Sequence, residues 1–131
     1  MPEPKKEIIH TDRAPKAIGP YSAGVKAGQL IFTAGQLGIV PETGNIIEGG
    51  IEQETRQALL NMQAILEQAG SSLERVVKTT VYLRDMADFS RMNNIYAEFF
   101  KASPPARSAI QVAALPKGAA VEIEAIALVG D

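Results

Sequence analysis

Two segments of the chain place apolar residues at helical spacing. The first, Ile51 to Ala69, is followed by Gly70, where a C-terminal helix cap is expected. The second begins after Asp88, whose side chain is predicted to cap it, and cannot extend past Pro104-Pro105. Their apolar stripes are Thr55, Ala58, Leu59, Met62, Ile65, Leu66 and Ala69 in the first and Phe89, Met92, Ile95, Tyr96, Phe99 and Phe100 in the second. Both patterns predict amphipathic helices.

Other segments have the composition and the flanking turn residues of β-strands. Ala27-Gly28-Gln29 suits a hairpin turn between two of them, and Leu115-Pro116-Lys117-Gly118 is predicted to join the last two as a second hairpin. The predicted strands are Lys6–Thr11, Ala23–Lys26, Leu30–Gln36, Val76–Leu83, Arg107–Ala113 and Ala120–Leu128. With the helices they give the order βββαβαββ, which is typical of an α+β fold.

The two helices are expected to pack on one face of a mixed sheet, because an amphipathic helix buries its apolar stripe against a second layer. The last strand nevertheless carries apolar residues on both faces. Val121 and Ile123 lie on one face, while Ile126 and Leu128 lie on the other. An apolar face that no helix covers favours self-association.

Length and charge narrow the class of protein. A chain of 131 residues without a repeat or a linker is expected to form a single domain over residues 1–131. Lys and Arg total 13 against 15 Asp and Glu, and the basic residues are scattered along the chain. Nucleic acid is therefore not the expected partner.

Several kinds of chemistry are excluded by residues that the sequence lacks. There is no cysteine, and the one histidine, His10, cannot build a Ser/His/Asp triad or a multi-histidine metal site within one subunit. Neither a P-loop nor a G-x-G-x-x-G pattern occurs, so we expect no metal and no cofactor. A polar start and the lack of any run of roughly 18 apolar residues predict a cytoplasmic protein with no membrane span.

Arg107 is the first candidate for a binding residue. It follows Pro104-Pro105-Ala106 and begins a predicted strand, so its guanidinium emerges where a stiff loop meets the sheet. Such a planar fork can bind a carboxylate through two parallel hydrogen bonds. The alternative is an ordinary solvated or salt-bridged surface arginine.

Glu122 and Glu124 are the candidates for acid–base chemistry. They alternate with Val121 and Ile123, so both carboxylates lie on one face of a strand. Because Ile126 continues that face, at least one carboxylate is expected to be partly buried, which raises its pKa. A structural ion pair and a general acid/base role are equally compatible with this pattern.

Two further segments are weaker candidates. Tyr21 follows the rigid Gly19-Pro20 turn, and Gly35 lies near the end of the predicted strand, where the backbone can approach a ligand closely. From its local sequence, Tyr21 fits a packed aromatic residue better than a catalytic one. We interpret Tyr96 of the second helix as a core residue.

Five motifs in this order and spacing resemble those of the RidA (YjgF) family. They span nearly the whole chain: Ala17-Ile18-Gly19-Pro20-Tyr21, Phe32-Thr33-Ala34-Gly35-Gln36, Val77-Lys78-Thr79-Thr80-Val81, Asn93-Asn94-Ile95-Tyr96, and a C-terminal signature from Pro105-Ala106-Arg107-Ser108 through Leu115-Pro116 to the 121–127 segment. The resemblance implies a chorismate-mutase-like α+β fold and a homotrimer with its sites in the clefts between subunits.

The resemblance also implies a role for each matching residue. Arg107 would hold the substrate carboxylate, and Glu122 would position or activate water. Tyr21, Gly35 and Asn93 would help to shape the pocket. Two departures from the family pattern lie in the pocket wall: Ala34 stands where many members have serine, and Ala109 where many have cysteine or a larger residue. We expect them to alter substrate preference more than activity.

The function implied is hydrolytic deamination of 2-aminoacrylate, 2-aminocrotonate and their imine tautomers, 2-iminopropanoate and 2-iminobutanoate, to 2-keto acids and ammonia. The main alternative is a regulatory trimer that binds 2-keto acids or amino acids without turnover. RNA cleavage, attributed to relatives, is disfavoured by the acidic balance of the chain. Chorismate mutase activity would rest on fold analogy alone.

Overall fold

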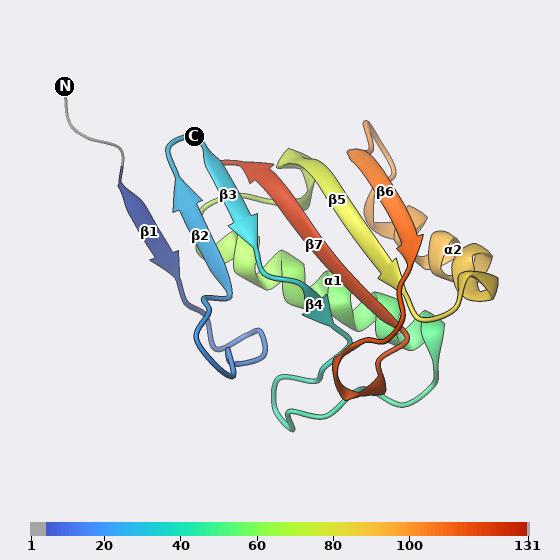
Figure 1. Ribbon diagram of the computed structural model, residues 1–131. Helices are drawn as coiled ribbons and strands as arrows, with labels where there is room; N and C mark the ends of the chain where they lie inside the picture. Colours follow the sequence, from blue (N-terminus) through green and yellow to red (C-terminus); the bar gives the residue numbers. More distant parts are fainter. Residues whose placement is uncertain (1–4, 131) are drawn as a thin grey trace.

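The computed structural model describes residues 5–130, and its strands form one mixed sheet (Figure 1). The strand order is β1-β2-β3-β7-β5-β6, and the short β4 also pairs with β7. The strands are β1 Lys6–Ile9, β2 Gly24–Ala27, β3 Leu30–Thr33, β4 Gln36–Leu37, β5 Val76–Leu83, β6 Ala106–Gln111 and β7 Val121–Leu128. All pairs are antiparallel except β5 with β6. β7 lies inside the sheet, between β3 and β5.

Two helices, α1 (Ile51–Gln68) and α2 (Phe89–Phe99), lie on the same face of this sheet, behind the strands in Figure 1. Short 3₁₀ turns occur at Leu73–Arg75, Met86–Asp88 and Pro116–Gly118. The α+β class and both helices are thereby confirmed. Gly70 follows α1 with a φ of 82°, the left-handed conformation expected at a C-terminal cap.

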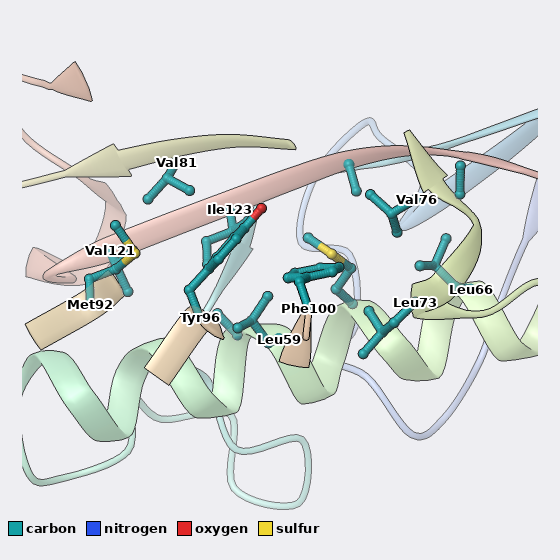
Figure 2. Packing of buried hydrophobic residues seen from close by; sticks show 14 of the residues in the cluster. Leu59, Leu66, Leu73, Val76, Val81, Met92, Tyr96, Phe100, Val121 and Ile123 are labelled. Atoms are coloured by element: carbon teal, nitrogen blue, oxygen red, sulfur yellow. The ribbon is translucent and has the colours of Figure 1, made fainter. Parts of the chain in front are cut away.

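The core lies between the sheet and the two helices (Figure 2). Leu59, Met62 and Leu66 of α1 are fully buried against Val121 and Ile123 of β7. From α2, Met92 and Tyr96 join the same cluster, and the Tyr96 hydroxyl points at the strands. The alternation along β7 places Glu122 and Glu124 on the opposite, helix-free face.

That second face carries a row of apolar side chains across four neighbouring strands. Ile8, Val25, Phe32 and Ile126 are directly paired from β1 to β7, so their side chains point to the same side. Ile8 is 56% exposed and Phe32 39% exposed. No helix within residues 5–130 covers this row, in agreement with the expectation of an uncovered apolar face.

The predicted strand Leu30–Gln36 is divided in two, which corrects the sequence prediction. β3 pairs with the end of β7, and β4 pairs with Ile123 and Glu122 nearer its start. Ala34 and Gly35 between them leave the ladder. A Cβ atom on Gly35 would lie only 1.9 Å from Oε2 of Glu122, so the backbone bends here around the glutamate side chain.

The predicted hairpin of the last two strands is wrong. β5 lies between β6 and β7, parallel to β6 and antiparallel to β7. The reason is that α2 connects β5 to β6 as a crossover, which makes these two strands parallel neighbours and leaves the other edge of β5 for β7.

Asp88 occupies the N-cap position of α2, as predicted, but its side chain makes no capping hydrogen bond. Asp85 is the residue whose side chain caps, because its Oδ1 accepts a hydrogen bond from the Ala87 amide at 2.9 Å and so begins a 3₁₀ turn ahead of α2. Asp88 accepts a hydrogen bond from Arg91 instead. The side-chain cap in this segment therefore lies three residues before the predicted one and belongs to the 3₁₀ turn.

Candidate active site

Glu122 lies in the centre of the sheet on its helix-free face. Its strand neighbours are Leu37 of β4 and Tyr82 of β5. Burial raises the pKa of its carboxyl above the ordinary value, and the nearby negative charge of Glu124 raises it further. The expectation of a partly buried carboxylate on this face is therefore met, and Glu122 is poised to exchange a proton nearer neutral pH than an exposed glutamate.

A cavity of about 530 Å³ opens beside this carboxylate. Four residues predicted for the site line it together, namely Tyr21, Ala34, Gly35 and Glu122. Its remaining wall is formed by Pro15, Lys16, Ile18, Ala23, Gln36, Leu37, Ile39, Pro116 and Lys117. The cavity is therefore mainly apolar, with one carboxylate and two lysines as its charged residues.

The cavity wall beside Glu122 is formed by the backbone at Gly35 and by the loop that carries Tyr21. Gly35 has no Cβ, which leaves room for the Glu122 side chain to lie against the backbone. Tyr21 extends from the loop between β1 and β2 and is 53% exposed. Its hydroxyl oxygen accepts a hydrogen bond from the Ile18 amide at 3.3 Å, so the phenol folds back onto its own loop.

Arg107 belongs to a different group of residues, at the edge of the sheet under α2. Its guanidinium carbon lies 4.8 Å from the ring centre of Tyr96 and 5.4 Å from that of Phe89. Its Nη1 donates to Oδ1 of Asn93 at 2.7 Å. Two aromatic faces and an amide thus fix the plane of the fork, and a positioned fork is suited to bind a carboxylate.

The surroundings of Arg107 are themselves fixed by buried contacts. Tyr96 shares a hydrogen bond of 2.8 Å with the hydroxyl of the fully buried Thr79. Burial raises the pKa of Tyr96, while the bond to Thr79 and the charge of Arg107 act in the opposite direction. Ala109, two residues along β6 from Arg107, packs against the main core cluster. Tyr96 is therefore a core residue, as predicted, and its ring also contacts the Arg107 guanidinium.

Arg107 and Glu122 lie on opposite faces of the sheet within one chain. Arg107 pairs with Thr79 of β5, which points toward α2, whereas Glu122 pairs with Tyr82, three positions along the same strand. Positions separated by an odd number of residues in a strand face opposite sides. The predicted site residues therefore form two separate groups, and Arg107 does not line the cavity beside Glu122.

Some residues around Glu122 and around Arg107 were not predicted from the sequence as site residues. Lys16, Ile39 and Lys117 line the cavity although no pattern singled them out. Phe89 was assigned to the apolar stripe of α2 but also contacts Arg107. The signal available for Lys117 was its place in the Leu115–Gly118 turn, where it adopts a φ of 59°, an unusual conformation for a residue other than glycine.

Within residues 5–130, no group of three or more His, Cys, Asp or Glu side chains is placed to hold a metal ion. In the same stretch, neither helix has the length and apolar character that crossing a bilayer requires.

Comparison with known proteins identifies the family. The family described as endoribonuclease L-PSP matches residues 11–129, which is most of the chain. The chain belongs to this family. A RutC family protein of Pyrococcus horikoshii is 57% identical over 122 residues, covering 93% of this chain and 97% of the relative.

A relative with a named activity and a solved structure with a bound ligand are similar to this chain over nearly the same part of its length. The human protein named 2-iminobutanoate/2-iminopropanoate deaminase is 50% identical over 125 residues, covering 95% of this chain and 91% of the human protein. The crystal structure of E. coli TdcF with bound serine has a TM-score of 0.89 and 45% identity, covering 93% of this chain and 98% of that one. These relatives confirm the resemblance to the RidA family.

Proposed function

We propose that the protein is a cytoplasmic homotrimeric deaminase that hydrolyses 2-aminoacrylate, 2-aminocrotonate and their imine tautomers to 2-keto acids and ammonia. The observation that carries the proposal is Glu122, a half-buried carboxylate with a raised pKa at the wall of a mainly apolar cavity. A relative half identical in sequence carries the name of this activity.

The opposite orientation of the two predicted catalytic residues supports a site shared by two subunits. Arg107 cannot contribute to the cavity of its own chain, yet its fork is fixed by Phe89, Asn93 and Tyr96. In a cyclic trimer the Arg107 edge of one protomer would face the Glu122 cavity of the next, with the uncovered apolar sheet face buried between them. The substrate would then contact Arg107 of one protomer and Tyr21, Ala34 and Gly35 of its neighbour, with Asn93 and Ala109 beside the arginine.

The reaction needs water and a proton carrier but no redox step. Arg107 holds the substrate carboxylate, so that the imine carbon lies near a water bound to Glu122. Glu122 accepts a proton as the water oxygen forms its bond to that carbon. The imine nitrogen takes up that proton, which gives a carbinolamine. Glu122 then carries the hydroxyl proton of the carbinolamine to the amino nitrogen, and as the C–N bond breaks the C=O bond of the 2-keto acid forms and ammonia is released. Proton transfer of this kind contributes typically 10²–10⁴-fold to a rate.

A regulatory trimer that binds 2-keto acids without turnover is the alternative. TdcF was crystallised with bound serine, so a related protein holds a small amino acid. Glu122 favours catalysis over binding alone, because a carboxylate beside an anionic ligand repels it. RNA cleavage, the activity in the family description, would require phosphate contacts and hence a strong dependence of binding on salt.

A coupled assay tests the proposal. A pyridoxal phosphate enzyme would generate 2-aminoacrylate from serine or 2-aminocrotonate from threonine, and the appearance of keto acid would be followed with and without the protein. We expect the protein to accelerate keto-acid release from the free intermediate. Binding of 2-keto acid with no acceleration would instead support the regulatory alternative.

A further inference from the structure

Of the three buried polar residues of α1, Asn61 and Glu54 have side chains that are hydrogen-bonded to segments outside the helix. Asn61 is 1% exposed and Glu54 6% exposed, and they are seven residues apart, so they lie two turns apart on the same side of the helix. Neither belongs to a motif singled out in the sequence. Burial of polar groups is costly unless every donor and acceptor is used, so each position calls for a partner.

Both polar atoms of the Asn61 amide are hydrogen-bonded, and its Nδ2 holds the chain beside the cavity. Its Nδ2 donates to the carbonyl oxygen of Leu37 at 3.1 Å and to that of Ile39 at 2.8 Å. Its Oδ1 accepts a hydrogen bond from Gln57 at 2.9 Å. Leu37 and Ile39 line the cavity, and Leu37 is the direct strand partner of Glu122.

The strand held by Asn61 has little support of its own. β4 has two residues, and its ladder pairs them with Ile123 and Glu122 alone. Directly after it, a Cβ on Gly38 would lie 2.6 Å from Cα of Glu54, so the chain packs against the backbone of α1. β4 is therefore held between Glu122 on one side and α1 on the other.

Glu54 fixes the start of β7, the strand that carries Glu122. Its Oε1 accepts a hydrogen bond from the amide of Ala120 at 2.8 Å, and Ala120 directly precedes β7. Glu122 is the second residue of that strand. The chain around β4 and the residue that precedes β7 are thus both tied to α1 by side-chain hydrogen bonds.

We propose that Asn61 and Glu54 are positioning residues for the reaction: they hold β4 and the start of β7 around Glu122, and so fix the carboxylate against the cavity wall. The proposal rests on the proposed function of Glu122. Neither residue lines the cavity, so both act through the backbone. Without these bonds, freed carbonyl and amide groups at the rim would take up water, which would reach the Glu122 carboxyl.

Four variants separate positioning from general stability. Asn61→Leu keeps a similar volume but cannot donate to either carbonyl, and Glu54→Leu cannot accept from Ala120. Glu54→Gln retains an acceptor oxygen and is the conservative rescue. Thr55→Val is the matched control, because Thr55 is fully buried on the same helix and its hydroxyl has no hydrogen-bond partner among the described residues.

The experiment records two quantities on folded variants of matched oligomeric mass: the ¹³C NMR titration of the Glu122 side-chain carboxyl, and kcat and KM for imine hydrolysis. Other titratable groups near Glu122 are Glu124, Tyr82, Tyr21, Lys16 and Lys117, and none is altered. In Asn61→Leu and Glu54→Leu, the Glu122 midpoint should move down toward that of an ordinary glutamate. In the same variants kcat should fall about 10-fold or more while KM changes little. Thr55→Val and Glu54→Gln should behave like the parent.

An unchanged Glu122 titration and kcat in the folded leucine variants would overturn the proposal, as would an equal change in Thr55→Val. Should Asn61→Leu fail to fold, the comparison of Glu54→Leu with Glu54→Gln decides alone. The titration does not depend on turnover. If the parent proves inactive in the coupled assay, the proposed function fails, while the NMR result still shows whether α1 sets the environment of Glu122.

Discussion

At the scale of single residues, the proposed chemistry depends on a carboxylate that the fold keeps partly away from water. Glu122 occupies a central strand, beside a glycine that leaves it room and next to a second carboxylate. The alternation Val121-Glu122-Ile123-Glu124 predicted which face the carboxylates share and that one would be partly buried. It could not predict that Gly35 lies against Glu122, because that contact depends on the register between β4 and β7.

Glu122→Gln tests the catalytic role of this residue. The amide keeps the shape of the side chain but cannot accept a proton from water, so we expect keto-acid release to fall by about 10²-fold or more. The measurement is steady-state turnover, with the mass of the assembly checked for both proteins. Turnover at the parental rate would move the catalytic role elsewhere, with Glu124 as the next candidate.

The raised pKa of Glu122 also predicts how stability depends on pH. The folded protein binds this proton more tightly than the unfolded chain, whose glutamate titrates near the ordinary value of 4.5. The contribution of Glu122 to stability is therefore greatest below that value and is lost as pH rises toward the folded pKa. Glu122→Gln lacks this titration, so its unfolding free energy relative to the parent should increase with pH across this window.

Denaturant unfolding at several pH values and one protomer concentration provides this measurement. Glu124→Gln, on the same strand and face, is the matched control for loss of a negative charge. A relative stability of Glu122→Gln that stays constant, or decreases with rising pH, would contradict the raised pKa.

At the scale of elements, local patterns located the helices and most strands, because apolar periodicity and turn residues act within a short window. Val76–Leu83 has the predicted bounds, and α1 ends one residue earlier than expected. Pairing was harder to predict. The position of β5 between β6 and β7 follows from the crossover through α2, and the interruption of Leu30–Gln36 follows from contact with a strand far along the chain.

Met92→Ala tests how strongly α2 is held to the sheet. Met92 is fully buried in the main core cluster, and its truncation leaves a cavity, so the unfolding free energy should fall by about 2–5 kcal/mol. Chemical denaturation at equal protomer concentration measures the loss. Ser90→Ala, exposed on the same helix, should change it by less than about 0.5 kcal/mol. Equal effects of the two changes would show that α2 is not anchored through its apolar stripe.

At the scale of the whole molecule, the separation of the site residues into two groups is the reason for proposing a site shared by two subunits. The sequence predicted that one sheet face would lack a cover, and the family resemblance implied sites between subunits. The structure places Arg107 and Glu122 on opposite faces, a relation that depends on three strands in register and that no local pattern contains. Association would both cover the row from Ile8 to Ile126 and bring the two groups together.

Complementation between two inactive variants tests the shared site most directly. Arg107→Ala and Glu122→Gln would be co-expressed with different tags, and mixed trimers isolated by both tags. In a cyclic trimer every mixed assembly has one site that takes Glu122 and Arg107 from intact copies, so turnover per trimer should recover to about one third of the parental value. Each variant alone should be nearly inactive. Mixed trimers as inactive as the single variants would contradict a site built from two subunits.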